Sequence, residues 1–243
     1  MRRVFAALSA FALLAAGTAA LASARPKGKH GKTTEFTVRI DALSTPTTLQ
    51  TSQGPKPVPL SPGVFAVYRG GNVLFRVGKP ADEGTERIAE DGFTSAEVSG
   101  LVGRPRVRDG GVFEQIGGDL GPAFEPGSSA EFTFGGRRGD RFSLETMFVQ
   151  SNDWFYGFRG LKLFQRGRPI SGDVTGKLAL YDAGTEVDEE PGAGTFQKPN
   201  QGPNDVDVGP SEDESVQLQS ETGDGFAVPD VSEVIRVTIA PTS

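Results

Sequence analysis

Short stretches of alternating hydrophobic and polar residues recur along most of the chain. The first is Phe36-Thr37-Val38-Arg39-Ile40, and others lie at residues 130–134, 142–148, 161–163, 178–180 and 235–239. Successive side chains of a β-strand point to opposite faces of a sheet, so this period of two predicts half-buried strands. Glycine and proline stand in almost every gap, as turns require, and Arg137-Arg138 fits a hairpin turn between Phe134 and Phe142. The pattern predicts an all-β fold, an antiparallel β-sandwich.

One region of the sequence favours helices. Residues 83–90 and 94–101 hold short amphipathic runs, and glycines (Gly92 and Gly103) bound them. A glycine just past the last helical residue is a common helix end. We expect one or two short helices that cover an edge of the sheet. The stretch Val187–Gln217 is acidic and rich in glycine, proline and asparagine, which predicts a long loop that is functional or partly disordered.

The first 24 residues have the layout of a secretory signal. Arg2 and Arg3 precede the apolar run Val4–Leu14, and the small residues Ala22-Ser23-Ala24 follow it, which is the three-part pattern of a cleavable signal peptide. A membrane anchor is the alternative, but alanine dominates the run and no basic stop-transfer cluster follows directly. We therefore expect cleavage near Ala24, a secreted protein (extracellular or periplasmic), and no transmembrane segment in the mature chain.

The segment after the signal is short and basic. Residues 25–33 contain the chain's one histidine, His30, and we expect a flexible linker there, followed by a single β-sandwich domain over residues 34–240. Removing the two arginines of the signal takes the formal net charge from −6 to −8. Binding to nucleic-acid phosphates needs a basic face, so we expect no nucleic-acid partner. No cysteine is present, so no disulfide stabilises the fold.

Three acidic residues stand beside predicted strands, spaced 29 and then 4 residues apart: Asp153, Asp182 and Glu186. Gly184 lets the backbone turn tightly enough to bring Asp182 and Glu186 together. Neighbouring carboxylates repel each other, so one of them holds a proton unless a cation binds. Three carboxylates with backbone carbonyls and water can supply the about six to eight oxygens that Ca²⁺ prefers. The spacing therefore predicts a calcium site.

Several of these residues also have a simpler interpretation. Asp153 can cap its own turn with its side chain. Trp154, the chain's one tryptophan, suits core packing as well as the rim of a binding loop. The acidic runs at residues 188–190 and 212–214 are typical of solvated loops.

Enzyme chemistry has little support in the sequence. Ser-His-Asp, Cys-His and zinc mechanisms need histidine or cysteine, and the one histidine, His30, falls in the expected linker. What remains is a glycosidase-like pair of carboxylates, which needs an acid of raised pKa in a sugar-sized cleft. A trio of acids beside a tight glycine turn suits a cation better, so we predict that the protein is not an enzyme.

The residues around the acids carry a family resemblance. Met147–Phe155 resembles the strand and Asp-Trp loop of the spondin N-terminal domain, and Tyr181–Glu190 resembles its second signature. Other matching segments are Leu60–Val67, Ala89–Gly92, Ser171–Gly176, Gln197–Gln201 and Val234–Ile239. The resemblance covers nearly all of residues 34–240. This family is known from extracellular matrix proteins and from secreted bacterial proteins.

The resemblance implies a C2-like β-sandwich that binds calcium through these loops, with Asp153, Asp182 and Glu186 as metal ligands. Animal members usually carry aspartate at the position of Glu186, and their cysteines and thrombospondin-type repeats are missing here. Their matrix and receptor-binding roles therefore do not carry over.

We expect an exported calcium-binding β-sandwich that acts in extracellular binding or surface association, with a protein or glycan at a cell surface as its partner. The first alternative is a carbohydrate-binding module in which Trp154 and Tyr156 stack on a sugar. The second is a structural envelope or matrix protein in which the metal only holds the loops together.

Overall fold

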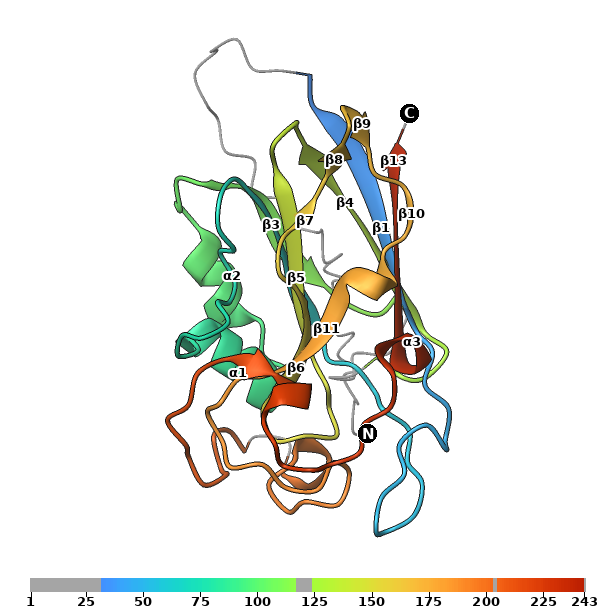
Figure 1. The fold of residues 1–243 in the computed structure, drawn as a ribbon, viewed down its shortest axis with the longest axis vertical. Helices are drawn as coiled ribbons and strands as arrows, with labels where there is room; N and C mark the ends of the chain where they lie inside the picture. Colours follow the sequence, from blue (N-terminus) through green and yellow to red (C-terminus); the bar gives the residue numbers. More distant parts are fainter. Residues whose placement is uncertain (1–31, 117–123, 203–204, 243) are drawn as a thin grey trace, which may run out of the picture.

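Two antiparallel β-sheets lie face to face in the computed structural model of this chain, which describes residues 32–116, 124–202 and 205–242 (Figure 1). The smaller sheet has the order β10 (Gly172–Asp173), β13 (Ile235–Thr242), β1 (Thr34–Ala42), β4 (Ser129–Gly136). The larger sheet has the order β12 (Gln217–Leu218), β11 (Leu178–Asp182), β6 (Trp154–Phe158), β5 (Arg141–Met147), β2 (Gly63–Tyr68), β3 (Val107–Phe113), with β7 (Leu161–Lys162) beside β5. The predicted all-β sandwich is confirmed.

Short elements complete the fold. A separate hairpin pairs β8 (Phe164–Gln165) with β9 (Arg168–Pro169). The helices are α1 (Glu83–Asp91), α2 (Ser95–Leu101) and α3 (Val231–Val234), with 3₁₀ turns η1 (Thr175–Lys177), η2 (Lys198–Asn200) and η3 (Gln219–Glu221). None of the helices in the described ranges is long and apolar enough to cross a membrane. The expected signal peptide and most of the expected linker, His30 included, lie outside the described residues.

The core lies between the two sheets. The alternating residues Phe36, Val38 and Ile40 of β1 are at most 1% exposed, and they belong to one apolar cluster with inward-facing residues of the larger sheet. Phe65 of β2 stacks on Phe132 of β4 with ring centroids 4.3 Å apart. Burial on one face of β1 thus produces the period of two that is visible in its sequence.

The larger sheet is buried on both faces. Figure 1 shows α1 and α2 as a third layer on its outer side, where Ile88 and Leu101 belong to the same apolar cluster as Val64 and Tyr68 of β2. Every residue of β2 is therefore buried, and this strand shows no alternation. The predicted helices form, but they cover a face of the sheet and not its edge. α1 ends at Gly92 in the left-handed conformation (φ 71°), as its position in the sequence predicts.

The turn at Arg137-Arg138 is not a hairpin. β4 pairs with β1, whereas β5 pairs with β2, β6 and β7, so the chain crosses between the two sheets at this turn. The turn itself is tight, with the Asp140 N–H donating to the Arg137 carbonyl at 2.9 Å. The hairpin prediction is wrong because these two consecutive strands belong to different sheets.

The long segment after β11 is attached to the ends of the central strands. The Gly192 N–H donates to the Gln150 carbonyl just after β5, and the Glu212 N–H donates to the Thr185 carbonyl just after β11. In Figure 1 this segment runs along the lower end of the sandwich, beside α1 and β6. Its anchored parts bring distant acidic residues to one place.

Candidate metal centre

Asp153 stands immediately before β6 and its side chain is fully buried. Its Oδ2 accepts hydrogen bonds from the Thr185 N–H at 2.7 Å, the Thr185 hydroxyl at 3.2 Å and the Glu186 N–H at 3.1 Å. Its Oδ1 is buried and has no hydrogen-bond partner among the described residues. Ser151, not Asp153, caps the turn, because its hydroxyl accepts the Trp154 N–H at 3.0 Å.

Asp182 and Glu212 bring their carboxylates to the same point. Asp182 ends β11, and its Oδ1 accepts the Gly184 N–H at 2.6 Å while its Oδ2 accepts the Gln217 amide at 3.4 Å. One carboxylate oxygen of each of Asp153, Asp182 and Glu212 lies within 4.8 Å of the other two. Two of these acids are buried and Glu212 is half-buried. The group is therefore partly open to solvent on the Glu212 side.

Gly184 allows the three carboxylates to lie close together. Its φ is +70°, and a Cβ atom at this position would lie 2.9 Å from the backbone of Glu214. Because glycine has no Cβ, the two segments approach closely enough for the Glu214 N–H to donate to the Gly184 carbonyl at 3.0 Å. This contact between the segments of Gly184 and Glu214 places Glu212 next to Asp153 and Asp182.

Glu186 lies outside this group of three. Its Oε1 accepts the Gly209 N–H at 2.9 Å, and its Oε2 accepts the Asn152 amide at 3.5 Å. Its backbone, not its carboxylate, contacts Asp153. The structure thus brings together two of the three predicted residues, Asp153 and Asp182, and places Glu212 where the sequence suggested Glu186.

Negative charge accumulates around Asp153. Burial raises the pKa of Asp153, and the nearby charge of Asp182 raises it further. Burial also raises the pKa of Asp182 and of Glu212. Asp188 has a buried Oδ1 without a partner in the described ranges, and burial, followed by the charges of Asp153 and Asp182, raises its pKa to about 9. A bound cation would relieve this repulsion and favour the charged carboxylates.

Sequence reasoning missed Asp188 and Glu212. Both lie in the acidic runs expected to be solvated loops, yet both are half-buried beside Asp153. No local motif marks Glu212, since only its pairing across Gly184 brings it to the site.

The two aromatic residues proposed for sugar stacking are core residues. Trp154 and Tyr156 are both 0% exposed, and the Trp154 ring lies edge-on to Phe148 with centroids 5.8 Å apart. Neither ring reaches the surface, so the stacking interpretation is wrong for both. Trp154 instead anchors β6 in the core and so fixes the position of its neighbour Asp153.

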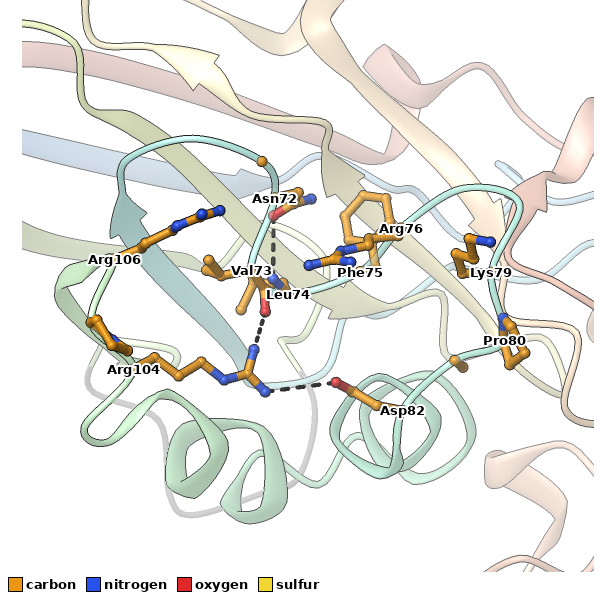
Figure 2. A pocket seen from close by; sticks show the side chains of 13 residues that line it. Asn72, Val73, Leu74, Phe75, Arg76, Lys79, Pro80, Asp82, Arg104 and Arg106 are labelled. Carbon is orange, nitrogen blue, oxygen red and sulfur yellow. Dashed lines mark hydrogen bonds and ion pairs between the residues drawn. The ribbon is translucent and has the colours of Figure 1, made fainter.

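A cleft of about 660 Å³ lies elsewhere, between α1 and the loop that follows β2 (Figure 2). Arg76, Lys79, Arg104 and Arg106 line it, with Asp82 as the one acidic residue of its lining. Arg104 donates to the Val73 carbonyl and lies 3.8 Å from Asp82. A glycosidase needs a pair of carboxylates in its cleft, and this cleft does not supply one.

The family model of Spondin_N matches residues 61–208, a range that includes Asp153, Asp182 and Glu186 but ends before Glu212. A comparison with curated proteins finds no match. The matched range covers more than half of the chain and includes the β2, β5, β6 and β11 strands that position the acidic group. The chain therefore belongs to the spondin N-terminal domain family.

Proposed function

We propose that this protein is an exported calcium-binding module in which Asp153, Asp182 and Glu212 hold the ion, and that it acts in binding or association outside the cell. Membership of the spondin N-terminal domain family supports an extracellular binding or adhesion-type role. The signal-like residues 1–24 support export. The partner is a protein or glycan at a cell surface.

The observation that carries the calcium proposal is the state of Asp153. One of its oxygens accepts three hydrogen bonds, while the other is buried without a hydrogen-bond partner in the described residues. Burying a charged carboxylate without compensation costs several kcal/mol. Two further carboxylate oxygens within 4.8 Å complete an all-oxygen group, which suits a hard divalent cation such as Ca²⁺.

The same geometry supports a binding role more than hydrolysis. Glycosidases hold their two carboxyl groups on either side of a scissile glycosidic bond, in a cleft that admits the sugar. Here the three acids form one group and Asp153 is fully buried. A buried Asp153 cannot flank a bound sugar, so we propose that the protein is not an enzyme.

Calcium titration by calorimetry, together with thermal unfolding, tests this proposal. Extracellular calcium sites have a Kd of about 10⁻⁴ to 10⁻³ M, so 10 mM Ca²⁺ should stabilise the fold by about 1.4 to 2.7 kcal/mol. For a domain of this size that corresponds to a rise of about 3 to 11 °C in Tm. Asp182→Asn and Glu212→Gln should lose the part of the rise that this site contributes, so their Tm should rise less with Ca²⁺ than that of the wild type.

Asp213→Asn is the matched control, because Asp213 is exposed and adjoins Glu212 but is not in the acidic group. It should keep the full calcium-dependent rise. A wild-type protein whose Tm does not respond to Ca²⁺ would overturn the proposal.

A structural role for the metal is the second candidate, because the ion would hold together loops that are distant in sequence. Capture of cell-surface proteins or glycans with and without Ca²⁺ separates the two roles. Calcium-dependent capture supports the binding module, whereas stabilisation without capture supports a structural envelope or matrix protein.

A further inference from the structure

A second group of carboxylates lies on the outer layer of the fold. Glu86 and Glu90 are one turn apart on α1, so they share a face of the helix. Asp207 reaches them from the loop that follows η2. One carboxylate oxygen of each residue lies within 4.8 Å of the other two. No residue of this group belongs to the first one.

Glu90 is the unusual member. It is 3% exposed, and its Oε2 is buried with no hydrogen-bond partner in the described part of the chain. Glu86 is half-buried and Asp207 is exposed, so the group is closed at Glu90 and open to solvent at Asp207. An ion can therefore reach the Glu90 carboxylate, whose Oε2 has no hydrogen-bond partner in the described residues.

The cationic side chains nearby form ion pairs with a different carboxylate, that of Asp91. Lys198 Nζ lies 2.9 Å from Asp91, and Arg87 Nη1 lies 3.3 Å from the same carboxylate. The group's own contact with a cation is that of Asp207, whose Oδ2 is 3.6 Å from Arg87 Nη2. The neighbourhood holds more carboxylates than cations, and Glu90 has no ion pair among the described residues.

We propose that Glu86, Glu90 and Asp207 form a second divalent-cation site beside the first. Only carboxylate oxygens are present, so the ligand is a hard cation of the Ca²⁺ type and not a zinc-like ion. The site goes beyond the proposed function, because its residues can bind an ion whether or not Asp153 and Asp182 do.

The Thr185-Glu186 segment links the two sites. Its backbone N–H groups donate to Asp153 of the first site, while the Glu186 carboxylate accepts the N–H of Gly209, two residues after Asp207. An ion at the second site would hold the loop of Asp207 against α1 and so hold Glu186 in place. Glu186 then connects the two sites, through its backbone N–H on one side and its carboxylate on the other.

Counting calcium ions per chain tests the proposal, by equilibrium dialysis of the purified protein followed by elemental analysis. The wild type should hold two ions. Glu90→Gln and Glu86→Gln should each hold one, and so should Asp182→Asn, while the Asp182→Asn/Glu90→Gln double variant should hold none. Glu86→Gln changes a half-buried position and serves if Glu90→Gln does not fold, as judged by circular dichroism with EDTA.

Glu83→Gln is the control, because Glu83 is exposed on the same helix and is not in the group; it should hold two ions. If the wild type instead holds a single ion, and Asp182→Asn loses that ion while Glu86→Gln and Glu90→Gln both keep it, the second site is overturned and the proposed function stands. A single ion with the opposite pattern would overturn the first site instead. Loss of an ion in Glu83→Gln would show that surface charge alone is responsible, and would overturn the second site.

Discussion

At the scale of single residues, Asp153 combines two roles in one carboxylate. Its Oδ2 closes the turn after β11 by accepting the N–H groups of Thr185 and Glu186. Its Oδ1 is buried without a partner among the described residues, and the carboxylate belongs to the group of three acids. The first role needs an acceptor and the second a negative charge. A substitution that keeps the acceptor and removes the charge can separate them.

We predict that Asp153→Asn keeps the fold and loses calcium binding at the site of Asp153, Asp182 and Glu212. In EDTA its stability should equal or exceed that of the wild type, because the amide oxygen can replace Oδ2 and no buried charge remains. Asp153→Ala should instead lose about 1 to 3 kcal/mol with or without Ca²⁺, since buried N–H groups are left unpaired. Urea unfolding in EDTA and in Ca²⁺ measures both effects. An Asn variant as unstable as the Ala variant would contradict this account.

The sequence points to Asp153 and Asp182 because each adjoins a strand, and the ends of neighbouring strands meet in space. β6 and β11 are indeed neighbours, with Trp154 opposite Asp182. Glu212 could not be predicted in this way, because it reaches the site through a pairing of loops across Gly184. Glu186 is close to Asp182 along the chain, but its carboxylate accepts the Gly209 N–H and lies outside the group of three.

At the scale of elements, the contact between α1 and α2 depends on Gly84. A Cβ atom at this position would lie 2.8 Å from the Glu97 backbone and closer still to the Glu97 carboxylate. Gly100 also lies inside a helix, but a Cβ there would meet only the end of the Arg104 side chain, at 3.3 Å. The two glycines therefore differ in what a methyl group would displace.

Gly84→Ala and Gly100→Ala should change stability in opposite directions. Alanine favours a helix over glycine by about 1 kcal/mol, and Gly100→Ala should gain up to that amount because Arg104 can move. Gly84→Ala should lose about 1 to 3 kcal/mol, because it forces α1 away from α2. Thermal unfolding of the two variants, compared with the wild type, checks the difference. Equal gains would show that α1 and α2 are not in close contact at Gly84.

The interface between the larger sheet and the helices α1 and α2 buries two further acids, which belong to neither of the two acidic groups. Glu97 is 1% exposed and Glu145 is 0% exposed. Burial, then the charge of Asp82, raises the pKa of Glu97 to about 8, although Arg104 opposes the shift. Burial and the charge of Glu97 raise the pKa of Glu145. The folded state therefore binds more protons than the unfolded state between the ordinary value of 4.5 and about pH 8.

Stability should consequently fall as the pH rises from 5 to 8. Glu97→Gln should weaken this fall by at least about 1.4 kcal/mol, the equivalent of one pKa unit. Urea unfolding at pH 5, 6.5 and 8, with the same high Ca²⁺ concentration throughout, measures the effect. Glu131→Gln, at an exposed position of β4, should keep the wild-type slope. A slope that Glu97→Gln leaves unchanged would contradict the assignment.

Periodicity predicts elements best where a single face is buried. β1 and β13 alternate, and they appear clearly in the sequence, whereas β2 is covered on both faces and shows no period. Two-residue strands such as β10 and β12 are too short to carry a pattern at all. Alternation along β4 and β5 does not show which sheet each strand joins. The turn at Arg137-Arg138 therefore resembles a hairpin in the sequence, although the two strands belong to different sheets.

At the scale of the whole molecule, the acidic groups and the ends of the domain lie at opposite ends of the sandwich. β1 begins and β13 finishes side by side, with Glu35 opposite Thr242, at the upper end of Figure 1. α1, β6 and the long segment after β11 lie at the lower end. A chain attached through either end would therefore present the loops of the acidic groups outward, which suits the proposed role in binding.

This arrangement predicts that calcium will order one end of the molecule only. The N–H groups of Gly184, Thr185 and Gly209 donate to carboxylates of the acidic residues, so they can exchange with solvent only when those loops open. If opening requires release of the ion, 10 mM Ca²⁺ should slow their exchange by about 10- to 100-fold for a Kd of about 10⁻³ to 10⁻⁴ M.

Hydrogen exchange followed by mass spectrometry gives the comparison within one molecule. Peptides covering residues 183–189 and 205–216 should be protected by Ca²⁺, while those covering the β8–β9 hairpin should exchange at the same rate with and without it. Asp182→Asn should remove protection at residues 183–189. Protection spread evenly over both ends would instead mean that the ion stabilises the sandwich as a whole, and that the loops are no more mobile than the sheets when the ion is absent.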